Sequence, residues 1–123
     1  MPDTQLQQIE HIVVLMLENR SFDHMLGYLS LPPALGGKGR TDVDGLKGTE
    51  TNKNAKGVPF PVMHMASPIM NGDPCHEWPC VEEQLSNNNG GFIRSYEKVV
   101  VSNPEFIMHY FTGTDLPVFD HLV

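Results

Sequence analysis

The strongest feature of the hydrophobic pattern is a continuous apolar run near the start of the chain. Residues 11–17 read H-I-V-V-L-M-L, with β-branched residues at the centre. Continuous rather than alternating apolarity is typical of a strand buried on both faces, as in a parallel sheet covered by helices. A polar tip, residues 18–20, follows the run, and Ser21 is placed to cap a short helix that Gly27 ends. The opening therefore predicts a strand, a polar tip and a helix.

The next stretch, residues 30–60, has little periodicity and is rich in Gly, Pro and Asn. We expect a long polar loop insertion here, followed by an extended segment over residues 59–63. Loops of this length are unusual in compact domains and tend to be functional or mobile.

The second half of the chain predicts short helices separated by turns. Pro79 suits the first turn of a helix over residues 79–85, which the run N-N-N-G-G then ends. Apolar residues at helical spacing predict further helices over 103–111 and from 115 onward. Residues 92–101 are ambiguous, and fit a short helix followed by the three valines at 99–101.

Only one buried strand appears in this pattern, and the last helical pattern is still running at Val123. One strand with several helices cannot form a parallel sheet. We therefore expect residues 1–123 to be one unit, the N-terminal part of a larger α/β domain that is incomplete in this chain.

The net charge of the chain argues against some classes of binding partner. The 123 residues carry 15 acidic and 8 basic side chains, a formal net charge of −7. This balance argues against a basic nucleic-acid surface and against electrostatic docking on an anionic membrane. No apolar run reaches the roughly 18 residues of a membrane span. The start shows no signal-peptide pattern, so we expect a cytoplasmic protein, or a secreted one whose leader is absent.

The two cysteines, Cys75 and Cys80, either pair with each other or remain thiols. A zinc site is less expected, because only these thiols and nearby His76 are available and structural zinc takes four ligands.

The first candidate site follows the apolar run. Glu18 and Asn19 offer hard oxygen donors suited to a divalent cation, at the strand end where ligands bind in open α/β sheets. Arg20 next to them is suited to bind an anion through two hydrogen bonds. The alternative is a solvated turn in which Arg20 pairs with Asp23.

The second candidate site is His76, which lies between two prolines and beside the only tryptophan, Trp78. Its imidazole is suited to donate to a phosphoryl oxygen, ligate a metal or move a proton. The alternative is a partly buried histidine packed on Trp78. We expect His24 to be a surface residue and the remaining candidates to be structural, namely His64, His109 and His121.

Both sites lie in longer motifs. Residues 9–27 read I-x-x-I-V-V-L-M-x-E-N-R-S-F-D-H-x-x-G, and residues 73–78 read D-P-C-H-E-W. Residues 108–117 read M-H-Y-F-T-G-T-D-L-P. In this order the motifs resemble the phosphoesterase family of non-specific phospholipase C and acid phosphatase A.

The resemblance implies an α/β/α sandwich of the alkaline-phosphatase type. It also implies hydrolysis of phosphate esters, such as phospholipid head groups, through a Ser or Thr nucleophile that this chain lacks. Glu18 and Asn19 would then bind a catalytic divalent metal ion, and His76 would bind phosphate or act as acid or base.

Two expectations follow from the same resemblance. With only part of the ligand set, the 123-residue chain alone is expected to be inactive. The alternative function is a truncated, non-catalytic module of the same fold that binds a ligand or partner. The metal, the substrate head group and the oligomeric state stay open.

Overall fold

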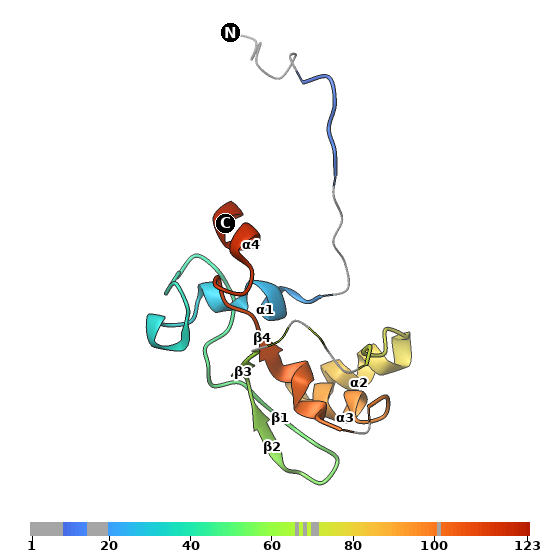
Figure 1. The fold of residues 1–123 in the computed structure, drawn as a ribbon. Helices are drawn as coiled ribbons and strands as arrows, with labels where there is room; N and C mark the ends of the chain where they lie inside the picture. Colours follow the sequence, from blue (N-terminus) through green and yellow to red (C-terminus); the bar gives the residue numbers. More distant parts are fainter. Residues whose placement is uncertain (1–8, 15–19, 66, 68, 70–71, 101) are drawn as a thin grey trace.

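The computed structural model describes residues 9–14, 20–65, 67, 69, 72–100 and 102–123. Short helices and strands follow one another along this part of the chain (Figure 1). In chain order they are α1 (Phe22–Met25), η2 (Gly27–Leu29), η3 (Pro33–Leu35), β1 (Thr51–Lys53), β2 (Pro59–Pro61), β3 (Met63–His64), α2 (Trp78–Asn89), α3 (Phe92–Tyr96), η4 (Pro104–Met108), β4 (His109–Tyr110) and α4 (Pro117–Leu122), where η marks a 3₁₀-helix.

The strands form two small two-stranded sheets. β1 and β2 are antiparallel, with Asn52 opposite Phe60, whereas β3 and β4 are parallel, with Met63 opposite His109. The chain therefore mixes helices and strands, as an α/β fold requires. The loop expected over residues 30–60 holds η3 and β1 as well as irregular backbone, and the extended segment at its end forms β2 and the start of β3.

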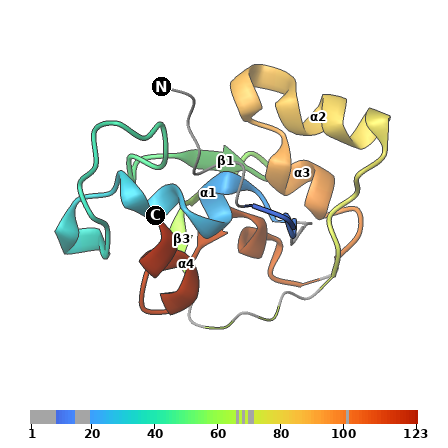
Figure 2. The ribbon, with the colours of Figure 1, turned by 90° about the horizontal axis from the view of Figure 1, so that it is seen from above.

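The core lies between η2, the loop around residue 46 and β4. It is made of Tyr28, Leu29, Leu31, Leu46 and Tyr110. The buried hydroxyl of Tyr28 donates a hydrogen bond to Oδ1 of Asp120 (2.6 Å), which fastens α4 to this core. A second buried group belongs to α3, which packs beside α2 (Figure 2). Its members are Ile93, Ser95 and Tyr96.

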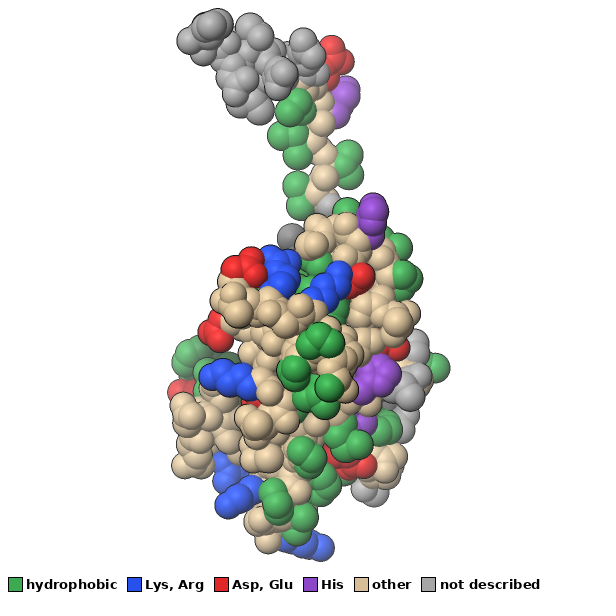
Figure 3. Space-filling view, turned by 90° about the vertical axis from the view of Figure 1, so that its left-hand side faces the viewer, with side chains coloured by type: hydrophobic (Ala, Val, Ile, Leu, Met, Phe, Trp, Pro, Cys, Tyr) green, Lys and Arg blue, Asp and Glu red, His purple; other side chains and the backbone are tan. Residues whose placement is uncertain are grey.

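The buried strand expected over residues 11–17 is wrong for the part that the structure describes. Residues 11–14 belong to no strand, and Val13 is 90% exposed. Residues 15–17 lie outside the described residues. Residues 9–14 stand away from the body of the molecule (Figures 1 and 3). A continuously apolar strand is buried only when neighbouring strands and covering helices surround it, and no described strand pairs with residues 11–14.

Several helix boundaries agree with the sequence. Oγ of Ser21 accepts a hydrogen bond from the backbone N of His24 (3.2 Å), as an N-cap of α1 should. Pro79 lies in the first turn of α2, and Pro117 begins α4. The helical backbone of α2 breaks at Ser86, and Asn87 to Asn89 have positive φ.

None of the helices in the described residues is long and apolar enough to cross a membrane.

The helix expected over residues 103–111 is correct only in part, because residues 104–108 form a 3₁₀-helix and residues 109–110 a strand. Asn103 has a φ of 55° and caps nothing with its side chain, and the following residues form η4 and then β4. Pairing of His109 and Tyr110 with β3 takes precedence over the helical spacing of the apolar residues. The ambiguous stretch 92–101 forms the short helix α3, and Val99 and Val100 lie in no strand.

Candidate functional site

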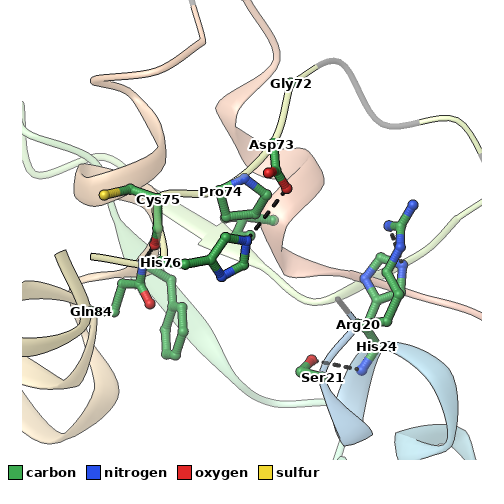
Figure 4. A pocket seen from close by; sticks show the side chains of 11 residues that line it. Arg20, Ser21, His24, Gly72, Asp73, Pro74, Cys75, His76 and Gln84 are labelled. Atoms are coloured by element: carbon green, nitrogen blue, oxygen red, sulfur yellow. Dashed lines mark hydrogen bonds and ion pairs between the residues drawn. The ribbon is translucent and has the colours of Figure 1, made fainter. Parts of the chain in front are cut away.

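A cavity of about 1200 Å³ separates the start of α1 from the loop that leads into α2. Arg20, Ser21 and His24 line one side, and Asp73 and His76 face them from the other (Figure 4). Arg20 of the first candidate site and His76 of the second thus share one cavity, although they are far apart in the sequence. The rest of the lining comes from Gly72, Pro74, Cys75, Gln84, Phe92 and Ile107.

Arg20 lies on this cavity and is positioned by His24. Nη1 of Arg20 lies 3.1 Å from Nε2 of His24. Because a guanidinium can only donate, Nε2 of His24 is the acceptor, and its ring carries its proton on Nδ1 when neutral. The side chain of Arg20 therefore projects from the end of the polar tip toward the space between the two motifs.

His24 is buried, which corrects the expectation of a surface residue. Only 8% of it is exposed, and its ring packs edge-on against Phe111, with the centroids 4.7 Å apart. Burial, and then the nearby charge of Arg20, lower the pKa of His24 to about 4. His24 is therefore a neutral acceptor at pH 7. Its place in the same motif as Arg20 is the one signal in the sequence that could have drawn attention to it.

His76 is exposed on the opposite side of the cavity. Its Nε2 lies 3.4 Å from Oδ1 of Asp73, and the two side chains are 59% and 69% exposed. Because a carboxylate accepts, this long contact favours the proton on Nε2 and leaves Nδ1 open. Trp78 is 72% exposed. The alternative of a histidine partly buried on Trp78 is therefore wrong.

The two cysteines form a disulfide bridge, with their Cα atoms 5.8 Å apart. This settles the choice that the sequence left open between a pair and two thiols. The bridge encloses His76 and Trp78 in a short loop. Cys80 belongs to the first turn of α2, so the bridge ties the loop before the helix to the helix itself.

The proposed metal ligands Glu18 and Asn19 lie outside the described residues. Within the described part of the chain, no three or more His, Cys, Asp or Glu side chains come together in a group that could hold a metal ion. A separate polar cluster lies outside the cavity lining, where His64 contacts Oδ2 of Asp115 at 2.8 Å and Thr112 donates to the same oxygen.

Taken together, the cavity offers groups for binding an oxyanion. The guanidinium of Arg20 donates in a planar fork that matches phosphate oxygens, and the imidazole of His76 can donate or move a proton. Asp73 would repel an anion directly, and its Oδ1 lies 3.4 Å from Nε2 of His76.

The chain is similar in sequence to known proteins. Residues 9–123 match the model of the Phosphoesterase family. Non-specific phospholipase C1 of Arabidopsis thaliana is 30% identical over 125 residues, which cover 93% of this chain and 22% of that protein. Non-specific phospholipase C6 of the same plant is 31% identical over 124 residues, covering 94% of this chain and 22% of that protein. The chain thus spans less than a quarter of the length of these relatives. No solved structure matches it.

Proposed function

Because this chain belongs to the Phosphoesterase family, we propose that it forms part of a phosphoric ester hydrolase of the phospholipase C type and supplies its phosphate-binding side chains. One observation carries the proposal: the motif around Arg20 and the motif around His76 line the same cavity. The names of the relatives favour phospholipids as substrates. They give no support to the alternative of a non-catalytic module.

Arg20 and His76 bind the phosphoryl group from opposite sides in this proposal. Arg20, oriented by the neutral ring of His24, donates to two non-bridging oxygens. His76 donates to a third oxygen or moves a proton at Nδ1, while Asp73 accepts from Nε2. Charge that develops on the phosphoryl oxygens is thereby neutralised by groups already in place.

The metal remains a proposal on Glu18 and Asn19. A carboxylate and an amide oxygen are ligands suited to a hard divalent cation, and both residues directly precede Arg20, which lines the cavity. A bound divalent ion would polarise the phosphoryl group. The Ser or Thr nucleophile and the alkaline-phosphatase type of sandwich are further parts of the proposal, and family membership is what supports them.

Binding of inorganic phosphate, measured by isothermal titration calorimetry, tests the proposal on the chain itself. Arg20→Ala and His76→Ala should each weaken binding by about tenfold or more, because each removes a hydrogen bond that involves a charged group.

Arg40→Ala is the matched control. Arg40 pairs with Asp42 and is not part of the cavity lining, so its loss should leave phosphate binding unchanged. Equal affinities for the Arg20→Ala and Arg40→Ala variants would contradict the proposal.

A further inference from the structure

The loop that carries His76 is fastened at one end to helix α3 and at the other end to helix α2. At its start, the hydroxyl of Tyr96 donates to the carbonyl oxygen of Gly72 (3.1 Å). At its other end, Nε2 of Gln84 donates to the carbonyl oxygen of Cys75 (2.9 Å) and contacts Oγ of Ser95 (3.3 Å). Tyr96 and Ser95 are each only 2% exposed, so both anchors reach into the packed interior.

Cys75 is also held by a covalent bond, to Cys80, which lies on the same face of α2 as Gln84. The disulfide joins it to Cys80, and Gln84 follows Cys80 by four residues. Residues four apart lie on one face of a helix. The residue directly before His76 is therefore tied to two successive turns of α2, once by a bond and once by a hydrogen bond.

The side chain of His76 has far weaker support than the backbone beside it. Among the described residues, its one polar contact is the 3.4 Å approach to Asp73, and both side chains are mostly exposed. The place of the imidazole in the cavity consequently depends on where the backbone at Cys75 is held.

Resting on the proposed function, we propose that the Cys75–Cys80 bridge and Gln84 are the positioning residues of His76, and that phosphate binding therefore depends on the redox state of the bridge. A dithiol reductant breaks the S–S bond and leaves two thiols on the chain, while the reductant itself becomes a cyclic disulfide. Gln84 alone then holds Cys75, and the imidazole must be ordered anew whenever phosphate binds.

The first experiment compares the chain as the disulfide, after reduction with dithiothreitol, and after reoxidation with oxidised glutathione. Reduction should weaken binding of inorganic phosphate by about twofold to tenfold, the usual cost of immobilising one side chain on binding. Reoxidation should restore the affinity. The matched control is the double variant Cys75→Ser, Cys80→Ser, which should bind like the reduced chain and not respond to dithiothreitol.

A spectroscopic measurement separates this inference from the proposed function. The imidazole signals of His76, assigned through the loss of those signals in His76→Ala, are followed by ¹H–¹⁵N NMR in the oxidised and reduced chain without phosphate. We expect them to shift and narrow on reduction, as the side chain averages over more positions. Gln84→Ala should change the same signals, whereas Glu82→Ala, on an exposed part of α2, should not.

The outcomes are distinct. If the oxidised chain binds no phosphate, the proposed function fails, and the His76 signals alone then decide the positioning role. Identical His76 signals before and after reduction would overturn the inference, even in a chain that binds phosphate well. Unchanged phosphate affinity on reduction would overturn the redox dependence.

Discussion

His24 owes its protonation state to its surroundings. Phe111 packs against the ring, Arg20 donates to Nε2, and the pKa falls from 6.5 to about 4. In the unfolded chain the same imidazole titrates near its ordinary pKa. Between these two values the unfolded state holds a proton that the folded state lacks, so folding stability decreases as the pH falls.

The pH dependence of unfolding tests this description of His24. The free energy of unfolding, measured with urea, should drop between about pH 6.5 and pH 4, with roughly 3 kcal/mol as the upper limit for this one group. The variant His24→Gln keeps an acceptor for Arg20 but does not titrate, so its profile should be flatter.

His121→Gln, at the exposed end of α4, is the matched control for this substitution. A slope as steep in His24→Gln as in the parent chain would show that the burial of His24 is not its source.

The sequence alone identifies some residues of the candidate site and misses the environment of others. Arg20 and His76 were recognisable from residue type and from the motifs that contain them. The burial of His24 was not, because its packing partner Phe111 lies 87 positions further along the chain. A local sequence pattern cannot predict a contact between residues so far apart in the chain. Likewise, the sequence left open whether Cys75 and Cys80 pair, and the structure shows the bridge between them.

At the scale of elements, one buried asparagine joins the β1–β2 hairpin to the helices. Asn52 of β1 is 6% exposed. Its Nδ2 donates to the carbonyl oxygen of Asn89 (3.0 Å), and its Oδ1 accepts from the backbone N of Phe92 (2.9 Å). Both partners lie where α2 ends and α3 begins, so this side chain fixes that junction against the sheet.

Asn52→Asp should therefore destabilise the chain by about 2–3 kcal/mol. The carboxylate still accepts from Phe92, but it has no donor for Asn89 and places a buried charge against the carbonyl oxygen of Asn89. Thermal unfolding followed by circular dichroism measures the loss.

Asn54→Asp is the control for this exchange. The side-chain oxygen of Asn54 accepts from the backbone N of Lys56 and of Val58, which a carboxylate does equally well. A similar loss of stability in both variants would contradict the role given to Asn52.

Element boundaries followed from the sequence where backbone chemistry is local. Ser21, Pro79, Pro117 and the asparagines after Ser86 each act on their own turn of chain, and the structure agrees with them. The predictions failed where a distant segment decides. Residues 109–110 have a helical pattern, but β3 supplies a pairing partner.

For the whole molecule, the exposed apolar segment is the feature that calls for an explanation. Ile12, Val13 and Val14 are 82%, 90% and 79% exposed. Continuous apolarity predicts burial, and the chain spans 22% of the relatives' length. In the proposed sandwich this segment would be a strand inside the sheet, with neighbours that the described residues do not provide.

Val13→Asp distinguishes these two environments. In the present chain the substitution should change the free energy of unfolding by less than about 0.5 kcal/mol, because the side chain is exposed in the folded state. The matching substitution in a full-length relative should cost several times more, since an unpaired charge would then be buried. Urea denaturation of both proteins provides the measurement. A large loss in the present chain would mean that residue 13 is packed.

Trp78 gives the loop around His76 an optical reporter of its own. It is the single indole of the 123 residues, it is mostly exposed, and it lies inside the ring closed by the Cys75–Cys80 bridge. A neighbouring disulfide quenches indole emission, and thiols do so less. Because Trp78 is exposed, its emission should be red-shifted. The emission should be weak while the bridge is intact and should increase as the bridge opens. A fluorescence spectrum therefore reports the oxidation state of a sample before any ligand is added.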